Sequence, residues 1–206
     1  MADMNYEDKW NYINDCLGDI VNNAEHAVRL KESFIYPAYD SKIRYTINGT
    51  RNAVFYGLCL NSIYFEYIMT LMRMYDDNEI DTSSFGNVII LLDKDFIKEY
   101  EQSYLRNISD NVNRAIIKYN GIKNSHYYAG IKMLRNKYLA HTATNILSNR
   151  MAKYGYADKI LDESICILNI LNEAFRRNRS DYVPIGRVYR RLSMEFWDNF
   201  VKNNAG

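Results

Sequence analysis

Apolar residues recur at steps of three and four along almost the whole chain, which is the spacing of one face of an α-helix. The first such stripe predicts a long helix, and we expect Pro37 to end it because the residue before a proline is pushed out of the α region. The chain has 2 prolines and 9 glycines, too few for the many turns of an all-β protein. The stripe consists of Trp10, Ile13, Leu17, Ile20, Ala24 and Ala27.

A second helix is predicted over about residues 50–75, and it is apolar on most sides, as is typical of a buried central helix. Ser83 or Ser84 is expected to cap a short helix that includes residues 88–92. A longer, more polar helix should follow and end at Asn120-Gly121, a common helix stop.

Three more helices complete the expected order. Ser125 is a suitable cap for a helix that runs past residue 141, another helix covers 161–175, and Pro184 suits the first turn of the last one. No repeat, linker or change in composition divides the chain. The sequence therefore predicts an all-α helical bundle, with residues 1–206 forming a single domain.

Composition narrows the class of protein. A hydrophobic share of 48% excludes disorder, and 26 Lys+Arg against 25 Asp+Glu excludes a strongly basic nucleic-acid-binding protein, although not a local basic face. Cys16, Cys59 and Cys166 cannot pair fully, which favours a reducing compartment. With no signal-like start and no aliphatic run longer than residues 88–92, we expect a soluble cytoplasmic protein without a membrane span.

The usual cofactor and metal motifs are missing from the sequence. It contains no Gly-rich phosphate loop, no H-E-x-x-H and no C-x-x-C. Asp76, Asn78 and Asp81 resemble the start of a calcium loop, but Asp81 occupies the required glycine position and Asn87 the terminal glutamate position. We therefore expect no cofactor and no metal.

One cluster of polar residues stands out in the segment LRNKYLAH, residues 134–141. Arg135 is followed directly by Asn136 and, six positions later, by His141, which continues the apolar stripe of Ile131 and Leu134. Arg135 and His141 are about 120° apart around an ideal helix, so a site that uses both needs the long reach of arginine, an irregular helix or a second copy of the chain. The alternative is a structural pair: an arginine at a helix end and a hydrogen-bonded core histidine.

This segment resembles the R-x(4–6)-H motif of the HEPN superfamily (higher eukaryotes and prokaryotes nucleotide-binding). The segment LMRMYDDNEIDTSSFGNVIILL, residues 71–92, is similar to the AbiU-type, abortive-infection branch, in which a helix ends in Arg-x-x-Asp before a Ser-rich helix start. The resemblance implies a four-helix core with extra terminal helices, a homodimer beside the motif helix, and metal-independent RNA cleavage in toxin or phage-defence settings. By the same resemblance Arg135 and His141 would be catalytic and Asn136 auxiliary.

Two other positions bear on the resemblance. Arg73 and Asp76 match the Arg-x-x-Asp pattern and are expected either to support the site or simply to pair on the helix surface. Some HEPN proteins are modified on a tyrosine two positions after the histidine, where this chain has Ala143. That form of control is therefore not expected here.

The proposed chemistry suits the residue types. RNA supplies its own nucleophile, the 2′-hydroxyl, histidine can accept and donate protons near neutral pH, and arginine can bind two phosphate oxygens. Six arginines near the C-terminus are either an RNA-binding surface or a solvated helix end. The alternatives to an enzyme are a non-catalytic module that binds a nucleotide, RNA or a partner protein such as an antitoxin, and a structural helical protein. The arginines are Arg176, Arg177, Arg179, Arg187, Arg190 and Arg191.

Overall fold

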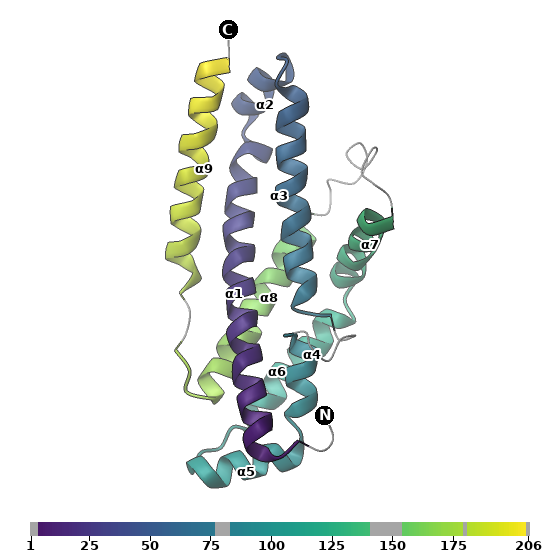
Figure 1. Cartoon of the computed structure of the whole chain (residues 1–206), viewed down its shortest axis with the longest axis vertical. Helices are drawn as coiled ribbons and strands as arrows, with labels where there is room; N and C mark the ends of the chain where they lie inside the picture. Colours follow the sequence, from purple (N-terminus) through teal and green to yellow (C-terminus); the bar gives the residue numbers. More distant parts are fainter. Residues whose placement is uncertain (1–3, 77–82, 141–153, 179–180, 205–206) are drawn as a thin grey trace. The chain divides into compact units, whose positions relative to one another are not determined.

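The computed structural model describes residues 4–76, 83–140, 154–178 and 181–204, and within these ranges it contains helices and no strand (Figure 1). The expected all-α helical bundle is confirmed. The helices are α1 (Tyr6–Tyr39), α2 (Ser41–Asn48), α3 (Ala53–Arg73), α4 (Phe85–Leu91), α5 (Lys94–Tyr104), α6 (Ser109–Lys123), α7 (His126–Ala140), α8 (Tyr154–Ala174) and α9 (Tyr182–Asn204).

The chain forms two compact units. Unit 1 comprises Met1–Ala24 and Leu71–Ser180, and unit 2 comprises Glu25–Thr70 and Asp181–Gly206. Two of the three boundaries fall inside α1 and α3, and the third lies between α8 and α9. The expectation of a single domain stays a prediction.

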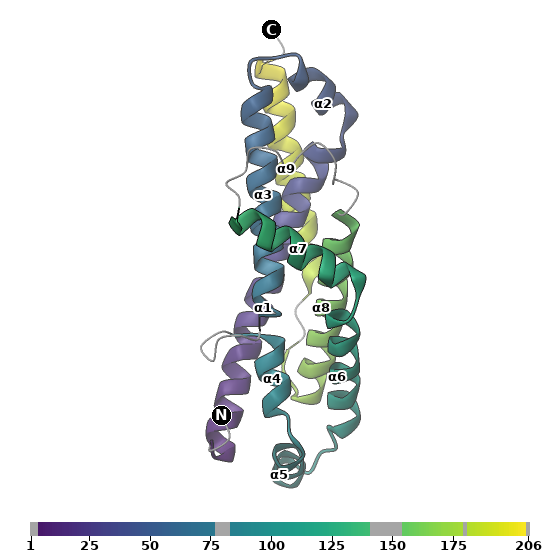
Figure 2. The ribbon, with the colours of Figure 1, turned by 90° about the vertical axis from the view of Figure 1, so that its right-hand side faces the viewer.

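Unit 1 is built around paired α6 and α8, which lie side by side in both views (Figures 1 and 2). Lys118 contacts Glu163, and Ile122 and Ile160 line one pocket, so the residue numbers rise along α6 as they fall along α8. The two helices are therefore antiparallel. At the end of α3, the fully buried ring of Tyr75 packs against Phe85, Tyr119 and Tyr128. This aromatic cluster fixes the point at which α3 ends.

Unit 2 contains the second part of α1 with α2, the first part of α3 and α9. Its core includes Ile43, Ile47, Tyr56, Trp197 and Val201. Figure 2 shows α2 beside α9. Helix α2 was not predicted from the sequence, although Asp40 caps it by accepting a hydrogen bond from the Ile43 amide at 2.9 Å.

Pro37 does not end the first helix, contrary to expectation. It lies in the last turn of α1, where a proline lacks the N–H that would bond the carbonyl of Ser33 four residues earlier. The hydroxyl of Ser193, on α9, donates to the Ser33 carbonyl at 3.0 Å instead. The proline is tolerated because a neighbouring helix supplies the hydrogen bond that it cannot make.

The predicted long helix before residue 119 is two helices, α5 and α6. The chain turns at Leu105, which has a left-handed backbone (φ 49°). The Glu101 carboxylate then accepts hydrogen bonds from the amides of Ile108 and Ser109 and from the Ser109 hydroxyl, at 2.7–2.9 Å. This carboxylate therefore supplies acceptors for the backbone N–H groups at the start of α6, and it stabilises the break between α5 and α6.

Two smaller expectations were also wrong. Gly121 does not stop its helix, because α6 continues to Lys123. Helix α3 is not buried on all sides, since Val54, Phe55 and Leu58 are exposed. By length and composition α3 is the one helix among the described residues that could span a membrane, but buried helices of soluble proteins pass the same test. The cytoplasmic location stays a prediction.

Candidate functional site

Helix α7 carries the residues of the predicted motif, and its start is well defined. As expected, Ser125 caps it: its Oγ accepts a hydrogen bond from the Tyr128 amide at 3.1 Å and donates to the Ile122 carbonyl at 2.7 Å. Gly130 lies so close to α8 that a Cβ atom would approach the Tyr156 ring to 3.0 Å. This close packing fixes the path of α7 towards its polar second half.

Arg135 and Asp76 form an ion pair between α7 and the end of α3. Nη1 of Arg135 donates to both carboxylate oxygens of Asp76, at 2.5 and 2.6 Å. The side chain of Arg135 is 14% exposed and that of Asp76 is 36% exposed, so the arginine is largely enclosed while the carboxylate is partly open to water. The contact joins the two sequence segments that carry the family resemblance.

The backbone before Asp76 is held from two sides. The Tyr75 hydroxyl donates to Ser164 Oγ at 2.8 Å, because the Ser164 hydroxyl hydrogen is used on the Ile160 carbonyl. Burial raises the pKa of Tyr75 well above its ordinary value, so this hydroxyl stays protonated. Lys123 Nζ donates to the Tyr75 carbonyl at 3.1 Å. Asp76 therefore extends from an anchored residue.

Lys123 is a cation near the site that sequence reasoning missed. Its ammonium donates to the Tyr128 hydroxyl at 3.2 Å and lies 4.9 Å from the centre of that ring and 5.8 Å from the centre of the Tyr119 ring. Lys123 is in the last turn of α6, and two tyrosines are close to it in the sequence. Many surface lysines have such a position. No pattern in the sequence singles it out.

The remaining motif residues are only partly described. Asn136 is exposed, and its Oδ1 accepts a hydrogen bond from Arg135 Nε at 3.3 Å. Arg73 is exposed in the last turn of α3. His141 and Ala143 lie outside the described residues, and α7 is described as far as Ala140. The structure thus brings together Arg135, Asn136 and Asp76, and the catalytic roles stay predictions.

The six C-terminal arginines do not all belong to one unit. Arg176 is exposed at the end of α8, whereas Arg177 donates to the backbone carbonyl of Asn14 at 2.9 Å, and burial lowers the pKa of its guanidinium. In unit 2, Arg187 is exposed, Arg190 bonds Glu32 at 2.7 Å, and Arg191 lies 3.8 Å from Glu195. Arg179 lies outside the described residues.

These contacts bear on the predicted RNA-binding surface. Arg177 and Arg190 each form a hydrogen bond to another residue of their own unit. Arg176 and Arg187 are exposed to solvent. The RNA-binding role stays a prediction for the group. Within the described ranges no three His, Cys, Asp or Glu side chains gather closely enough to hold a metal ion.

Comparison with known proteins gives one result that covers nearly the whole chain. Residues 4–196 match the AbiU2 family of HEPN proteins. No curated protein and no solved structure matches. The match includes both segments that the Arg135–Asp76 ion pair joins. The chain belongs to the HEPN AbiU2 family.

Proposed function

We propose that this protein is a metal-independent endoribonuclease that acts as a toxin or phage-defence effector, with Arg135 and His141 as its catalytic residues. Family membership supports an abortive-infection, HEPN-type module. The observation that carries the further step is the contact between Arg135 and Asp76, because it holds the motif arginine at a defined place in unit 1.

The reaction is transfer of a phosphate from the 5′-oxygen of one nucleotide to the 2′-oxygen of the nucleotide before it. His141 accepts the proton of the 2′-hydroxyl, whose oxygen attacks the adjacent phosphorus. The bond from phosphorus to the 5′-oxygen breaks, and a second proton donor, His141 of another copy, protonates the leaving oxygen. The products end in a 2′,3′-cyclic phosphate and a 5′-hydroxyl.

Arg135 stabilises the charge that builds on the phosphate in this step. Its guanidinium stays charged and can direct several N–H groups at phosphate oxygens. Asp76 acts as a positioning residue: two oxygens bound to one nitrogen of Arg135 orient the guanidinium before RNA arrives. Orientation in advance lowers the cost of forming the transition state.

A second copy of the chain completes the site in this proposal. One histidine cannot be base and acid at the same moment, and a homodimer brings two motif helices into one groove. RNA is the substrate, and a partner protein that restrains cleavage, an antitoxin, fits the proposed toxin role.

A non-catalytic binding module is the second candidate, and one observation favours it. Arg135 is only 14% exposed and its charge is balanced by Asp76, as expected of an arginine that holds two helices together. In that case the surface around α7 would bind RNA, a nucleotide or a protein without cleaving anything.

Cleavage of a mixed RNA pool in EDTA separates the two candidates. The wild-type protein should produce 2′,3′-cyclic phosphate ends, and His141→Ala should lower the rate by about 10²–10⁴ while the thermal unfolding midpoint stays unchanged. His26→Ala is the matched control, because His26 lies in unit 2 with a side chain 45% exposed. Equal rates for His141→Ala and wild type would exclude the proposed mechanism.

A further inference from the structure

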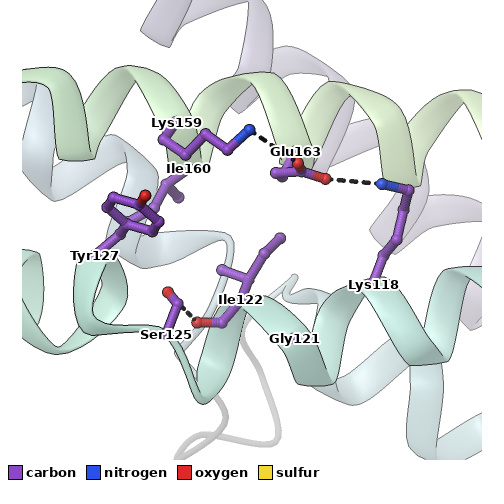
Figure 3. A pocket seen from close by; sticks show the side chains of 8 residues that line it. All are labelled: Lys118, Gly121, Ile122, Ser125, Tyr127, Lys159, Ile160 and Glu163. Carbon is purple, nitrogen blue, oxygen red and sulfur yellow. Dashed lines mark hydrogen bonds and ion pairs between the residues drawn. The ribbon is translucent and has the colours of Figure 1, made fainter.

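Unit 1 contains a pocket of about 230 Å³ where α6, α7 and α8 meet (Figure 3). It lies outside the Arg135–Asp76 contact, and the proposed cleavage step does not use it. The part of the lining that matters consists of Lys118 and Ile122 from α6, Tyr127 from α7, and Lys159, Ile160 and Glu163 from α8.

The inner surface of the pocket is apolar. Ile122 and Ile160 are 6% and 2% exposed, so they form a closed floor. The Tyr127 ring stands at one end of the pocket (Figure 3). The Tyr156 ring packs against it at an interplanar angle of 79°, with 5.1 Å between the ring centres. An aromatic side wall beside an aliphatic floor suits a flat, mostly apolar ring.

The charged groups form a row along one edge. Glu163 lies between two lysines and bonds Lys118 at 2.8 Å and Lys159 at 3.3 Å (Figure 3). Its hydrogen bond from Lys118 lowers the pKa of the Glu163 carboxyl and raises the pKa of Lys118, so this pair is ionised at neutral pH. Two cations and one anion leave a net charge of about +1 at the rim, which attracts an anion.

The pocket and Arg135 lie along the same helix. Tyr127 and Arg135 are eight residues apart, or about 12 Å along α7. The helix sequence HYYAGIKMLRNKYLA has no acidic residue, and Lys132, between the two positions, is exposed. A polyanion that reaches from the pocket to Arg135 therefore meets only neutral and positive side chains on α7.

We propose that this pocket binds one nucleotide of single-stranded RNA, a few nucleotides from the bond that Arg135 and His141 act on. The base lies against Tyr127 and the isoleucine floor, and its phosphate lies beside Lys159 and Lys118. The inference rests on the proposed ribonuclease function, and it adds a site that positions the RNA.

The size and chemistry of the pocket argue for this occupant over others. At about 230 Å³ it is smaller than the roughly 300–1,000 Å³ of sites for drug-sized ligands, so it suits one base rather than a complete dinucleotide cofactor. A free inorganic anion would leave the apolar floor unused. A purely apolar ligand would leave the two lysines unused.

The direct test uses methyl NMR of the full-length protein labelled at isoleucine. Adenosine 3′-monophosphate and uridine 3′-monophosphate should shift the Ile122 and Ile160 methyl signals, whereas inorganic phosphate and the uncharged nucleosides should bind more weakly. Tyr127→Ala should weaken nucleotide binding about 5- to 150-fold, the usual effect of losing one stacked base. Tyr45→Ala is the matched control, because Tyr45 is 89% exposed and belongs to unit 2.

A second variant guards against loss of folding. Lys159 is 52% exposed, so Lys159→Ala should fold normally. It should also reduce the slope of log affinity for RNA against log salt concentration by about 1, the value for one lost phosphate contact. The proposal is overturned if nucleotides leave both isoleucine signals in place, or if Tyr127→Ala and Lys159→Ala both bind nucleotides as the wild type does.

The two proposals fail in different ways. If RNA is cleaved but Tyr127→Ala has the KM of Tyr45→Ala, the ribonuclease stands and the pocket is no RNA subsite. If nucleotides shift the Ile122 and Ile160 signals but no RNA is cleaved, the pocket stands as a nucleotide site and the catalytic proposal is the one that fails.

Discussion

One guanidinium nitrogen of Arg135 binds both carboxylate oxygens of Asp76, although the two residues are 59 positions apart in the sequence. Asp76 follows Tyr75, which is fully buried and hydrogen-bonded to Ser164 on α8. The carboxylate therefore extends from a point that the core holds in place, and it defines where the arginine head lies. The motif on α7 depends on the end of α3 for its geometry.

Removing the charge of Asp76 should lower activity more than stability. Asp76→Asn keeps the shape of the side chain but loses the charge, and we expect kcat/KM for RNA to fall about 10- to 100-fold, the equivalent of one hydrogen bond to a charged group. The unfolding free energy should fall by only about 1 kcal/mol, because the Asp76 carboxylate, the group that loses its charge, is partly open to water. Cleavage assays and denaturant titration measure the two effects separately.

A double-mutant cycle tests whether Asp76 acts through Arg135. If it does, Asp76→Asn should cause no further loss of activity once Arg135 has been changed to Ala. If the fold-losses of the two single variants multiply in the double variant, Asp76 acts on the reaction independently of the arginine. Asp93→Asn is a suitable control, because Asp93 also pairs with a cation, Lys9, at 2.7 Å in the same unit.

The pH dependence of stability should include a contribution from Glu101. Hydrogen bonds from the Ser109 hydroxyl and the Ile108 amide lower the pKa of this carboxyl from its ordinary 4.5. A lowered pKa in the folded state means that the stabilisation is complete above about pH 4.5 and is lost as the pH falls through the folded-state pKa. Glu101→Gln should therefore be less stable than wild type by about 1 kcal/mol at pH 7, as for a lost helix cap. Thermal melts of the two proteins should converge as the pH falls below the folded-state pKa of Glu101, and a difference that persists in acid would contradict this explanation.

Proposed catalysis by two histidines requires a homodimer, which is expected to have about twice the 24.3 kDa chain mass. Light scattering coupled to gel filtration at micromolar concentration should give about 49 kDa. A pure 24 kDa species that still cleaves RNA would show that one copy is sufficient. Mixing wild-type chains with an excess of His141→Ala chains adds a second measurement, since a mixed dimer holds only one His141 and should lose activity although one of its chains is wild type.

Local sequence signals predicted much of the fold. Ser84 accepts from the Asn87 amide and Ser125 from the Tyr128 amide, as their positions suggested. One error arose where a distant residue decides the outcome. Pro37 remains helical because the Ser193 hydroxyl donates a hydrogen bond to the Ser33 carbonyl, and Ser193 is 160 positions after Ser33. Helix spacing alone carries no information about such a contact.

The candidate site was predictable only in part for the same reason. Arg135 and Asp76 each stood out in a motif, but the nearest cation in sequence to Asp76 was Arg73, so a local pair was one expected outcome. The observed pair with Arg135 depends on how α7 packs beside the end of α3. Neither Lys123 nor the pocket at Tyr127 has a sequence signature. Lys123 bonds the Tyr75 carbonyl at the end of α3, and the pocket is lined by residues of three helices, so both depend on tertiary packing.

The hydrogen bond between Ser193 and Ser33 predicts a coupling with Pro37. Ser193→Ala should destabilise the protein by about 1–3 kcal/mol, because the Ser33 carbonyl loses a donor that Pro37 cannot replace. Pro37→Ala restores an N–H at the position that bonds this carbonyl in a regular helix. The cost of Ser193→Ala, measured by urea unfolding, should therefore be smaller in the Pro37→Ala background. Equal costs in both backgrounds would mean that Ser193 acts through packing alone.

Arg135→Lys distinguishes an arginine that binds phosphate from one that only joins two helices. Lysine keeps one positive charge and can still pair with Asp76, but it loses the planar group that directs several N–H bonds at once. If Arg135 stabilises the transition state, kcat/KM for RNA should fall about 10²- to 10³-fold, as when one donor to a developing oxyanion is removed. The unfolding midpoint should change little, because the ion pair is retained. Lys132→Arg is the matched control, since Lys132 is exposed on the same helix. An Arg135→Lys variant with wild-type cleavage and wild-type stability would assign the arginine a purely electrostatic role, and the proposed phosphate contact would have to be abandoned.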